Sequence, residues 1–255
     1  MKNFGKILSV LLLISMLGII FYLGFDVRNE KPYEITLVEL NGCSYLPTEN
    51  YFKYAKLDNK DTYPELTLPT IKSRFEKHPY IKKADVIYSG NGKVEVYLKE
   101  KSFKALIFAG KNEVIVTEDF ELLPVLKYTQ HLSLPIITLS DSNKLKPFEF
   151  VKSDKQLLPA YEILDAVKII NPKLYDNLSE IDLSNKTNIG LYFTFADYPV
   201  KVSRGSEIEN VYVFNHLWKL LDGNELNQYL KYIDLRYKGK IFLGLEERYI
   251  KGAKA

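Results

Sequence analysis

The sequence predicts an α+β protein that follows a single membrane-spanning helix near its N-terminus. One long apolar stretch lies close to the start of the chain. After it come short alternating segments of β type, mixed with a few amphipathic helical ones. With 255 residues and 46% hydrophobic content, the chain is long enough for one large or two modest domains, each burying a core.

The charge pattern argues against a nucleic-acid partner. The formal net charge is only +3, and both signs are interspersed without a long basic or acidic run. Cys43 is the single cysteine, so the chain cannot form an internal disulfide. Such a cysteine-poor chain is compatible with an oxidising compartment.

The first expected element is a transmembrane helix over residues 7–25. A helix of roughly 19 residues spans close to 30 Å, the hydrocarbon thickness of a bilayer. Lys2 and Lys6 precede it, so residues 1–6 are expected to form a cytoplasmic tip, with the bulk of the chain extracytoplasmic. A cleaved signal peptide is the alternative, but its apolar core would be shorter and would end at a small-x-small site.

Residues 33–101 are expected to form a compact β-α-α-β-β module. Thr67 or Thr70 can cap its second helix, and Asn91-Gly92 favours a tight hairpin turn between its last two strands. The alternating apolar faces of the strands need cover, which the amphipathic helices supply. The expected elements are 35–40, 47–57, 67–77, 81–88 and 93–99.

Residues 102–246 are expected to form a second, strand-rich domain with two helices. Ser153-Asp154 is the expected cap of the first helix, which runs to about residue 170, and the second helix covers 208–221. Residues 247–255 are charged and are expected to be a flexible tail. The expected strands are 105–108, 114–117, 122–125, 134–139, 178–183, 189–195, 200–202, 232–236 and 240–245.

The sequence predicts no catalytic, cofactor or metal site. The three histidines, His78, His131 and His216, lack the i, i+4 spacing of a zinc helix, and no cysteine pair exists. No Gly-x-Ser-x-Gly elbow or Ser-x-x-Lys motif is found. The chain is therefore expected not to be an enzyme, although carboxylates that converge only in space escape such a search.

The order of the predicted parts resembles the FtsQ/DivIB family of bacterial cell division. In that family the first exported module is a POTRA domain and the second is the β domain. The stretch 38–42 resembles the first POTRA strand with its Asn-Gly end, and 78–86 is similar to the family's Pro-Trp-Val-x-x-Ala-x-Val stretch. The stretch 94–101 resembles the strand that ends the POTRA domain. Residues 232–237 are close to the family's Val-Asp-Leu-Arg-Tyr.

This resemblance implies a non-enzymatic divisome scaffold in the cell inner (plasma) membrane at the division septum. Its implied partners are FtsB- and FtsL-type proteins and, indirectly, the septal peptidoglycan synthase, with no nucleic acid, small-molecule substrate or cofactor. The family's last strand offers an open edge to an extended partner segment. The partner-binding residues it implies here are Arg236, Tyr237, Gly239, Lys240, Ile241, Phe242, Leu243 and Gly244.

Several alternatives stay open on the sequence alone. Arg236 could instead pair with Asp234 or Glu247, and the terminal strand could be an ordinary buried strand. A POTRA-containing chaperone or outer-membrane assembly factor is a second function, although such proteins usually carry tandem modules or a barrel. A membrane-anchored cell-wall hydrolase or transferase is a third.

Overall fold

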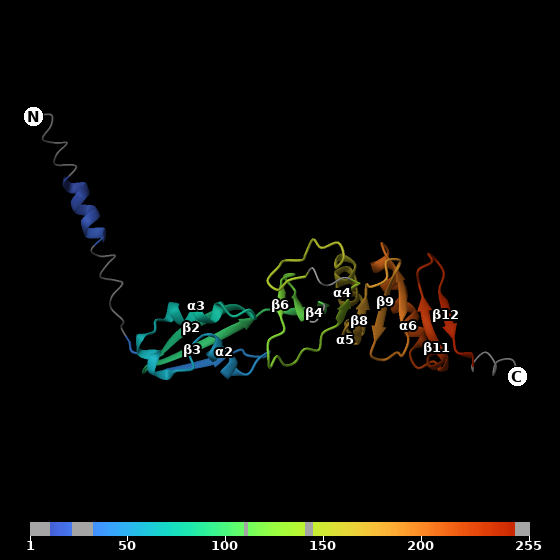
Figure 1. Ribbon diagram of the computed structural model, residues 1–255, viewed down its shortest axis with the longest axis horizontal. Coiled ribbons are helices and arrows are strands. Elements are labelled where there is room, and N and C mark those ends of the chain that lie inside the picture. The colour runs from blue at the N-terminus through green and yellow to red at the C-terminus, as the bar shows by residue number, and fades with distance from the viewer. Residues whose placement is uncertain (1–10, 22–32, 110–111, 141–144, 248–255) are drawn as a thin grey trace, which may run out of the picture. The chain divides into compact units, whose positions relative to one another are not determined.

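The computed structural model describes residues 11–21, 33–109, 112–140 and 145–247 (Figure 1). The chain separates into two compact units. The first comprises Met1–Cys43 with Thr48–Lys99, and the second comprises Ser44–Pro47 with Glu100–Ala255. Both units combine helices with sheets, so the predicted α+β class is confirmed. The expected tail lies outside the described residues, apart from Glu247.

The described part of the predicted membrane helix is residues 11–21, which are helical with their large apolar side chains more than half exposed. Among the described residues, no helix has both the length and the apolar character needed to cross a membrane. The two ends of the predicted span and the expected cytoplasmic tip lie outside these residues. The membrane span therefore stays a prediction.

The first unit follows the expected β-α-α-β-β order, with one additional 3-10 helix. Its three-stranded sheet has the order β1-β3-β2, and β1 runs parallel to β3. The elements are β1 (Leu37–Asn41), α2 (Thr48–Tyr54), η1 (Lys60–Glu65), α3 (Leu68–Glu76), β2 (Ile81–Gly90) and β3 (Lys93–Glu100).

Local sequence signals explain this unit. The Thr67 hydroxyl accepts the N–H of Thr70 at 3.3 Å and caps α3 as predicted. In the β2–β3 hairpin, Asn91 and Gly92 have φ of 49° and 75°, the left-handed pair that a two-residue turn requires. A side chain at Gly92 would also collide with the Thr36 hydroxyl, so glycine is needed there on two grounds.

The second unit contains one mixed nine-stranded sheet in the order β12-β11-β10-β9-β8-β7-β4-β5-β6. The pairs β4–β7, β7–β8 and β10–β11 are parallel and the others antiparallel. The strands are β4 (Phe103–Ala109), β5 (Asn112–Thr117), β6 (Leu122–Pro124), β7 (Ile136–Thr138), β8 (Leu178–Asp182), β9 (Asn188–Phe193), β10 (Val200–Ser203), β11 (Leu230–Asp234) and β12 (Phe242–Leu245).

The helices of this unit are α4 (Leu158–Ile170), α5 (Pro172–Asp176) and α6 (Glu207–Leu221), with the 3-10 helix η2 (Glu225–Tyr229). They share a single apolar core with the sheet. Buried residues alternate along β9 and β10, so one face of the sheet contributes to this core. The sequence predicted two helices here, and α5 was missed.

The predicted cap of α4 was wrong. The helix begins at Leu158, while the Asp154 carboxylate accepts the N–H of Gln156 within a turn before it. Pro159 gives the reason, because a helix starting at residue 155 would need an N–H at position 159 for its ladder. Starting at Leu158 instead places Pro159 in the first turn, where that N–H is not required.

Candidate functional site: the terminal sheet edge

β11 and β12 form an antiparallel hairpin at one end of the nine-stranded sheet. Ile233 lies opposite Leu243, and Asp234 lies opposite Phe242. β12 is the last strand in the order, so its outer side pairs with no other strand of the described chain. Such an edge presents backbone N–H and C=O groups that an extended segment can use.

The two faces of β12 differ in their surroundings. Leu243 and Leu245 pack against the apolar core. Side chains alternate along a strand, so Phe242 and Gly244 lie on the opposite face, away from this core. The Phe242 side chain is 47% exposed. The strand is therefore held to the core on one side and offers an aromatic ring on the other.

Tyr232 covers Gly244 across the hairpin. The two residues lie opposite each other, and a Cβ at position 244 would fall 2.7 Å from the ring carbon Cζ and even closer to two others. The Lys201 ammonium lies 4.4 Å from the centre of the same ring, a cation–π distance. The tyrosine ring thus occupies the space that a side chain at position 244 would need, so this position requires glycine.

The Arg236 guanidinium is paired within the hairpin. Its Nε and Nη2 donate to the two carboxylate oxygens of Asp234 at 2.9 and 2.6 Å, and its backbone N–H donates to the same carboxylate at 3.1 Å. Asp234 is buried, and the paired Arg236 holds the pKa of its carboxyl below the usual value. Of the two pairings considered for Arg236, the one with Asp234 is therefore present.

A tight turn connects the two strands. The carbonyl of Tyr237 accepts the N–H of Lys240 at 2.9 Å, and Gly239 has φ of 70°, in the left-handed region that favours glycine. After the turn, the Phe242 ring meets the Tyr237 ring edge-on, with 5.3 Å between centroids. The Arg236 guanidinium lies 5.7 Å from the Tyr237 ring. An arginine and two exposed aromatics thus share one end of the hairpin.

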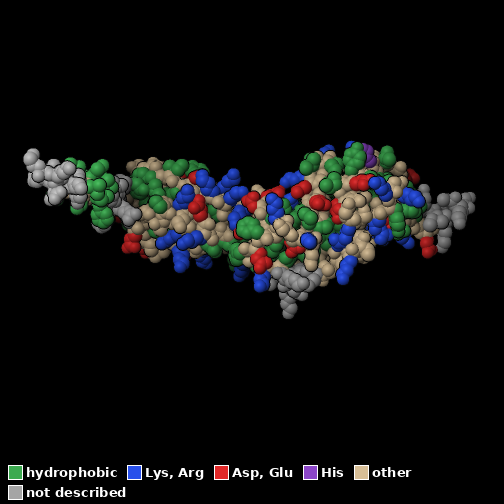
Figure 2. Space-filling view, turned by 90° about the horizontal axis from the view of Figure 1, so that it is seen from above, with side chains coloured by type: hydrophobic (Ala, Val, Ile, Leu, Met, Phe, Trp, Pro, Cys, Tyr) green, Lys and Arg blue, Asp and Glu red, His purple; other side chains and the backbone are tan. Residues whose placement is uncertain are grey.

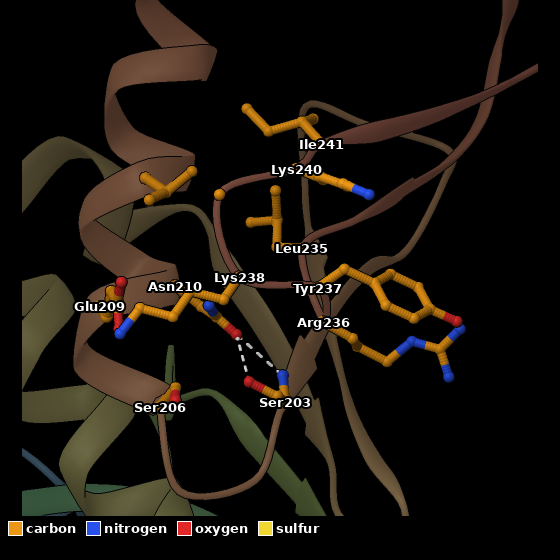
Figure 3. A pocket seen from close by; sticks show the side chains of 12 residues that line it. Ser203, Ser206, Glu209, Asn210, Leu235, Arg236, Tyr237, Lys238, Lys240 and Ile241 are labelled. Carbon is orange, nitrogen blue, oxygen red and sulfur yellow. Dashed lines mark hydrogen bonds between the residues drawn. The ribbon is translucent and has the colours of Figure 1, made fainter.

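A cavity of about 260 Å³ lies between this connection and α6 (Figure 3). In that view the side chains of Arg236 and Tyr237 point away from α6, whereas Leu235 lies between the hairpin and the helix. The Asn210 side chain on α6 accepts both the N–H and the hydroxyl of Ser203. The hairpin therefore has a helix-facing hollow and a separate aromatic side.

All eight sequence-predicted site residues lie in this hairpin, but their surroundings differ. Tyr237, Ile241 and Phe242 are exposed apolar residues, whereas Leu243 packs on the core. The expected strands were shifted, because β11 ends at Asp234 and β12 begins at Phe242. The bond from the Arg236 N–H to the Asp234 carboxylate and the turn at 237–240 occupy the intervening chain.

Sequence reasoning missed two contributors, Tyr232 and Lys201. The i, i+2 spacing of Tyr232 and Asp234 places both on one face, a signal that was available. The contact of Lys201 with Tyr232 comes from a neighbouring strand, so no local pattern reveals it. Within the described part of the chain, no group of three or more His, Cys, Asp or Glu residues could hold a metal ion.

Comparison with known families decides the assignment. Residues 105–236 match the family model described as cell division protein FtsQ/DivIB, C-terminal, which covers more than half of the chain. The chain therefore belongs to the FtsQ/DivIB family. The matched region ends at Arg236, so the turn and β12 of this FtsQ/DivIB member follow directly after it.

Two individual proteins are similar to this FtsQ/DivIB chain. Cell division protein DivIB of Clostridium acetobutylicum is 20% identical over 215 residues, which cover 84% of each chain. The solved major extracytoplasmic domain of the trans isomer of DivIB from Geobacillus stearothermophilus is 13% identical. That match covers 49% of this chain and 98% of the domain, with a TM-score of 0.30. At this TM-score the likeness supports no inference about the fold.

Membership in the FtsQ/DivIB family supports a role in cell division and, in general terms, interactions with other division proteins. It does not favour the alternative of a chaperone or outer-membrane assembly factor.

Proposed function

We propose that the protein is a non-enzymatic, membrane-anchored scaffold of the divisome. It links FtsB- and FtsL-type partners to the septal wall-synthesis machinery through its extracytoplasmic domains. Family membership supports the division role, and the open outer side of β12 supports the scaffold role. The first 6 residues lie in the cytoplasm, residues 7–25 form the anchor, residues 33–101 are the POTRA domain and residues 102–246 the β domain.

The observation that carries this proposal is the combination of an unpaired strand edge with exposed aromatic side chains. Backbone groups along β12 give an incoming extended segment its hydrogen bonds, and side chains on the two faces select its sequence. Tyr237 and Phe242 are 53% and 47% exposed and touch each other. Tyrosine and arginine are enriched among residues that dominate binding energy, which fits the grouping of Arg236 with Tyr237.

The ion pair between Arg236 and Asp234 preorganises the binding surface. The guanidinium is held by two bonds to the buried carboxylate, so little side-chain entropy remains to be lost on binding. Gly244, covered by Tyr232, keeps that stretch of the strand free of a protruding side chain. The partner segment therefore meets a largely preformed surface.

A binding experiment with the full-length chain tests the proposal. Its affinity for the exported part of the host's FtsB–FtsL pair is compared between wild type, Tyr237→Ala and Phe242→Lys. Phe150→Lys is the matched control, because Phe150 is 73% exposed and lies near the opposite edge of the same sheet. Circular dichroism establishes that each variant folds.

Loss of binding in the two folded hairpin variants, with Phe150→Lys unchanged, supports a scaffold that acts through β12. Equal binding by all variants contradicts the β12 site, and a folded wild type that does not bind contradicts the scaffold itself. Activity of the wild type on purified peptidoglycan would contradict the non-enzymatic assignment.

A further inference from the structure

A row of exposed side chains runs along α6 on the side away from the core. Ile208, Tyr212 and Leu220 are 56%, 56% and 73% exposed, and His216 between them is also exposed. The Tyr212 and His216 rings touch, with 4.4 Å between their centroids. In Figure 2, a histidine lies among apolar side chains on the surface of the second unit. This row, 208/212/216/220, is called the α6 row below.

The α6 row and two charged residues share one sector of the helix. Successive residues advance by about 100°, so positions 208, 212, 216 and 220 lie within a sector of roughly 120°. Glu209 and Lys219, both exposed, fall inside the same sector. Val211, Phe214 and Leu221 are buried and tie the other side of α6 to the core.

The residues of this sector are arranged symmetrically about position 214. If the helix is paired with a reversed copy of itself, each residue meets one of matching size or opposite charge. The reversal places Ile208 opposite Leu220 and Tyr212 opposite His216. It also places the negative Glu209 opposite the positive Lys219. A two-fold symmetric contact requires this kind of match, because the same patch must face itself in reverse.

We propose that the α6 row is a self-association surface that binds α6 of a second copy of this chain in antiparallel orientation. The two-fold axis passes the exposed side of the helix at the level of residue 214. Rows at i, i+4 spacing pack between each other when two helices cross, so the α6 row supplies the ridge that such a contact needs. Each contact contains two Glu209–Lys219 pairs, one on either side of the axis.

A second copy fits this surface better than an unrelated apolar partner. Helices that bind a lipid surface carry Lys and Arg beside their apolar face, and an acidic residue beside the row does not favour such binding. Here both charge signs are present, at positions that complement each other only in an antiparallel copy. A single pair of helices buries less than the roughly 1,000 Å² of a stable interface, so the association is weak and reversible.

The α6 row is separate from the partner-binding hairpin of the proposed function. None of its four residues lines the cavity beside the hairpin, although Glu209 does. The crosslinking test uses row positions only, so its failure and a failure of partner binding are distinguishable.

Cysteine crosslinking of the full-length chain tests the pairing and its direction. Two single-cysteine variants, Ile208→Cys and Leu220→Cys, are made in a Cys43→Ser background and treated with a short bismaleimide, separately and mixed. In the antiparallel contact, residue 208 of one copy lies beside residue 220 of the other. Identical positions are separated by roughly 18 Å along the helix axis before any tilt between the helices.

We expect crosslinked dimer from the mixture, in several-fold excess over either variant alone. Crosslinking of each variant with itself at least as well as the mixture would indicate a parallel contact and overturn the proposal. Absence of dimer from the mixture, at concentrations where the chain is folded, would also overturn it.

Charge reversal provides a second, independent readout. Glu209→Lys replaces both attractive pairs by repulsive ones and should weaken association on the order of tenfold. Adding Lys219→Glu in the same chain restores both pairs with opposite polarity and should recover the wild-type level. Equal weakening by the single and double variants would contradict the proposed pairing, because a merely local effect of Glu209→Lys is not rescued at position 219.

Discussion

The two edges of the nine-stranded sheet differ in whether another segment of the described chain pairs with them. At the β6 edge, the chain at 148–151 runs alongside. The N–H of Leu122 donates to the carbonyl of Glu149 at 2.9 Å, and the N–H of Phe148 donates to the carbonyl of Leu122 at 2.6 Å. Glu121 and Phe150 form a β-bridge there. At the other edge, β12 pairs with β11 on its inner side and with no strand of the described chain on its outer side.

This contrast shows which edge of the sheet is left unpaired among the described residues. Unpaired edges invite association with other chains, and proteins normally cover them with a strand, loop or charge. The β6 edge is covered by the chain itself, while β12 combines an open side with Tyr237 and Phe242. Exposed aromatics alone do not distinguish the edges, since Phe148 and Phe150 are also exposed. The backbone pairing distinguishes them.

The largest expected effect on the free energy of unfolding is at Gly244. It tests whether the Tyr232 ring restricts which residue β12 can carry at this position. Gly244→Val should lower the free energy of unfolding by about 2–3 kcal/mol, because the tyrosine ring must move to admit the side chain. Urea unfolding of the full-length chain measures this. Gly239→Ala is the control, since nothing lies within 4 Å of a Cβ there.

Gly239→Ala should cost only about 1 kcal/mol, from backbone strain at positive φ. Adding Tyr232→Ala to Gly244→Val should make the combined loss smaller than the sum of the two single losses, because the clash is gone. Strict additivity would show that the ring does not restrict position 244.

Opening the covered edge is the next largest effect. Phe148→Pro removes the N–H that bonds Leu122 and forces φ away from its value of 70°. We expect the cover to detach at a cost of about 1–3 kcal/mol, with loss of hydrogen-exchange protection at the Leu122 amide.

Phe148→Gly is the matched control for this cover. Glycine keeps the N–H and accepts the positive φ, so the Leu122 amide should remain protected. Equal loss of protection in both variants would mean that the Phe148 side chain, rather than its backbone, holds the cover in place.

A smaller effect is expected from the ion pair at the open edge. Arg236→Gln leaves the Asp234 carboxylate buried without its main partner and should cost about 1 kcal/mol near neutral pH, since Arg236 is partly exposed. In the wild type, the lowered pKa of Asp234 gives stability that is complete above the unfolded-state pKa of about 3.9. That stability is lost as pH falls through the folded-state pKa.

In Arg236→Gln the pKa of Asp234 rises, so the Asp234 contribution to stability should fade at a higher pH than in the wild type. Unfolding free energies from pH 7 down to pH 3 measure the difference. Asp234→Asn in the same background should remove this pH dependence. Superimposable wild-type and Arg236→Gln curves would show that the pair does not contribute.

The smallest effect on stability is expected from removing one exposed aromatic ring at each edge, and these variants compare the binding function of the two edges most directly. Phe242→Ala and Phe150→Ala each remove one exposed ring, one at each edge, and both should change the free energy of unfolding by less than about 0.5 kcal/mol. Only Phe242→Ala should weaken binding to the FtsB–FtsL pair in a titration. Equal weakening by the two variants would remove the functional distinction between the edges.

Much of the local structure was predictable from the sequence, and the errors have a common origin. Asn171-Pro172 was interpreted only as the end of a helix. The Asn171 side chain also accepts the N–H of Leu174 and caps α5, with Pro172 in its first turn. The same two residues therefore end one helix and begin the next. The error at Ser153-Asp154 likewise involved residues of capping type, because Pro159 makes α4 begin later, at Leu158.

The sequence predicted a hairpin at the candidate site but not the surroundings of its residues, and binding by these residues stays a prediction. Resemblance to a family implied partner-binding residues in the last hairpin, and residues 240–245 were expected to form its terminal strand. The tertiary structure decided that Leu243 faces the core, that Tyr232 covers Gly244 and that Asp234 holds Arg236. Strand β10, about 30 residues earlier in the chain, lies beside both residues: Lys201 is opposite Asp234 in the sheet, and its ammonium contacts the Tyr232 ring.

The sequence by itself determined the α+β class, the turn at Asn91-Gly92 and the absence of recognisable catalytic motifs. These follow from backbone preferences and side-chain periodicity within a few residues. Only the tertiary structure decided the strand order, the cover over β6 and the open side of β12. Those features require pairing between residues up to tens of positions apart, which short-range preferences do not encode.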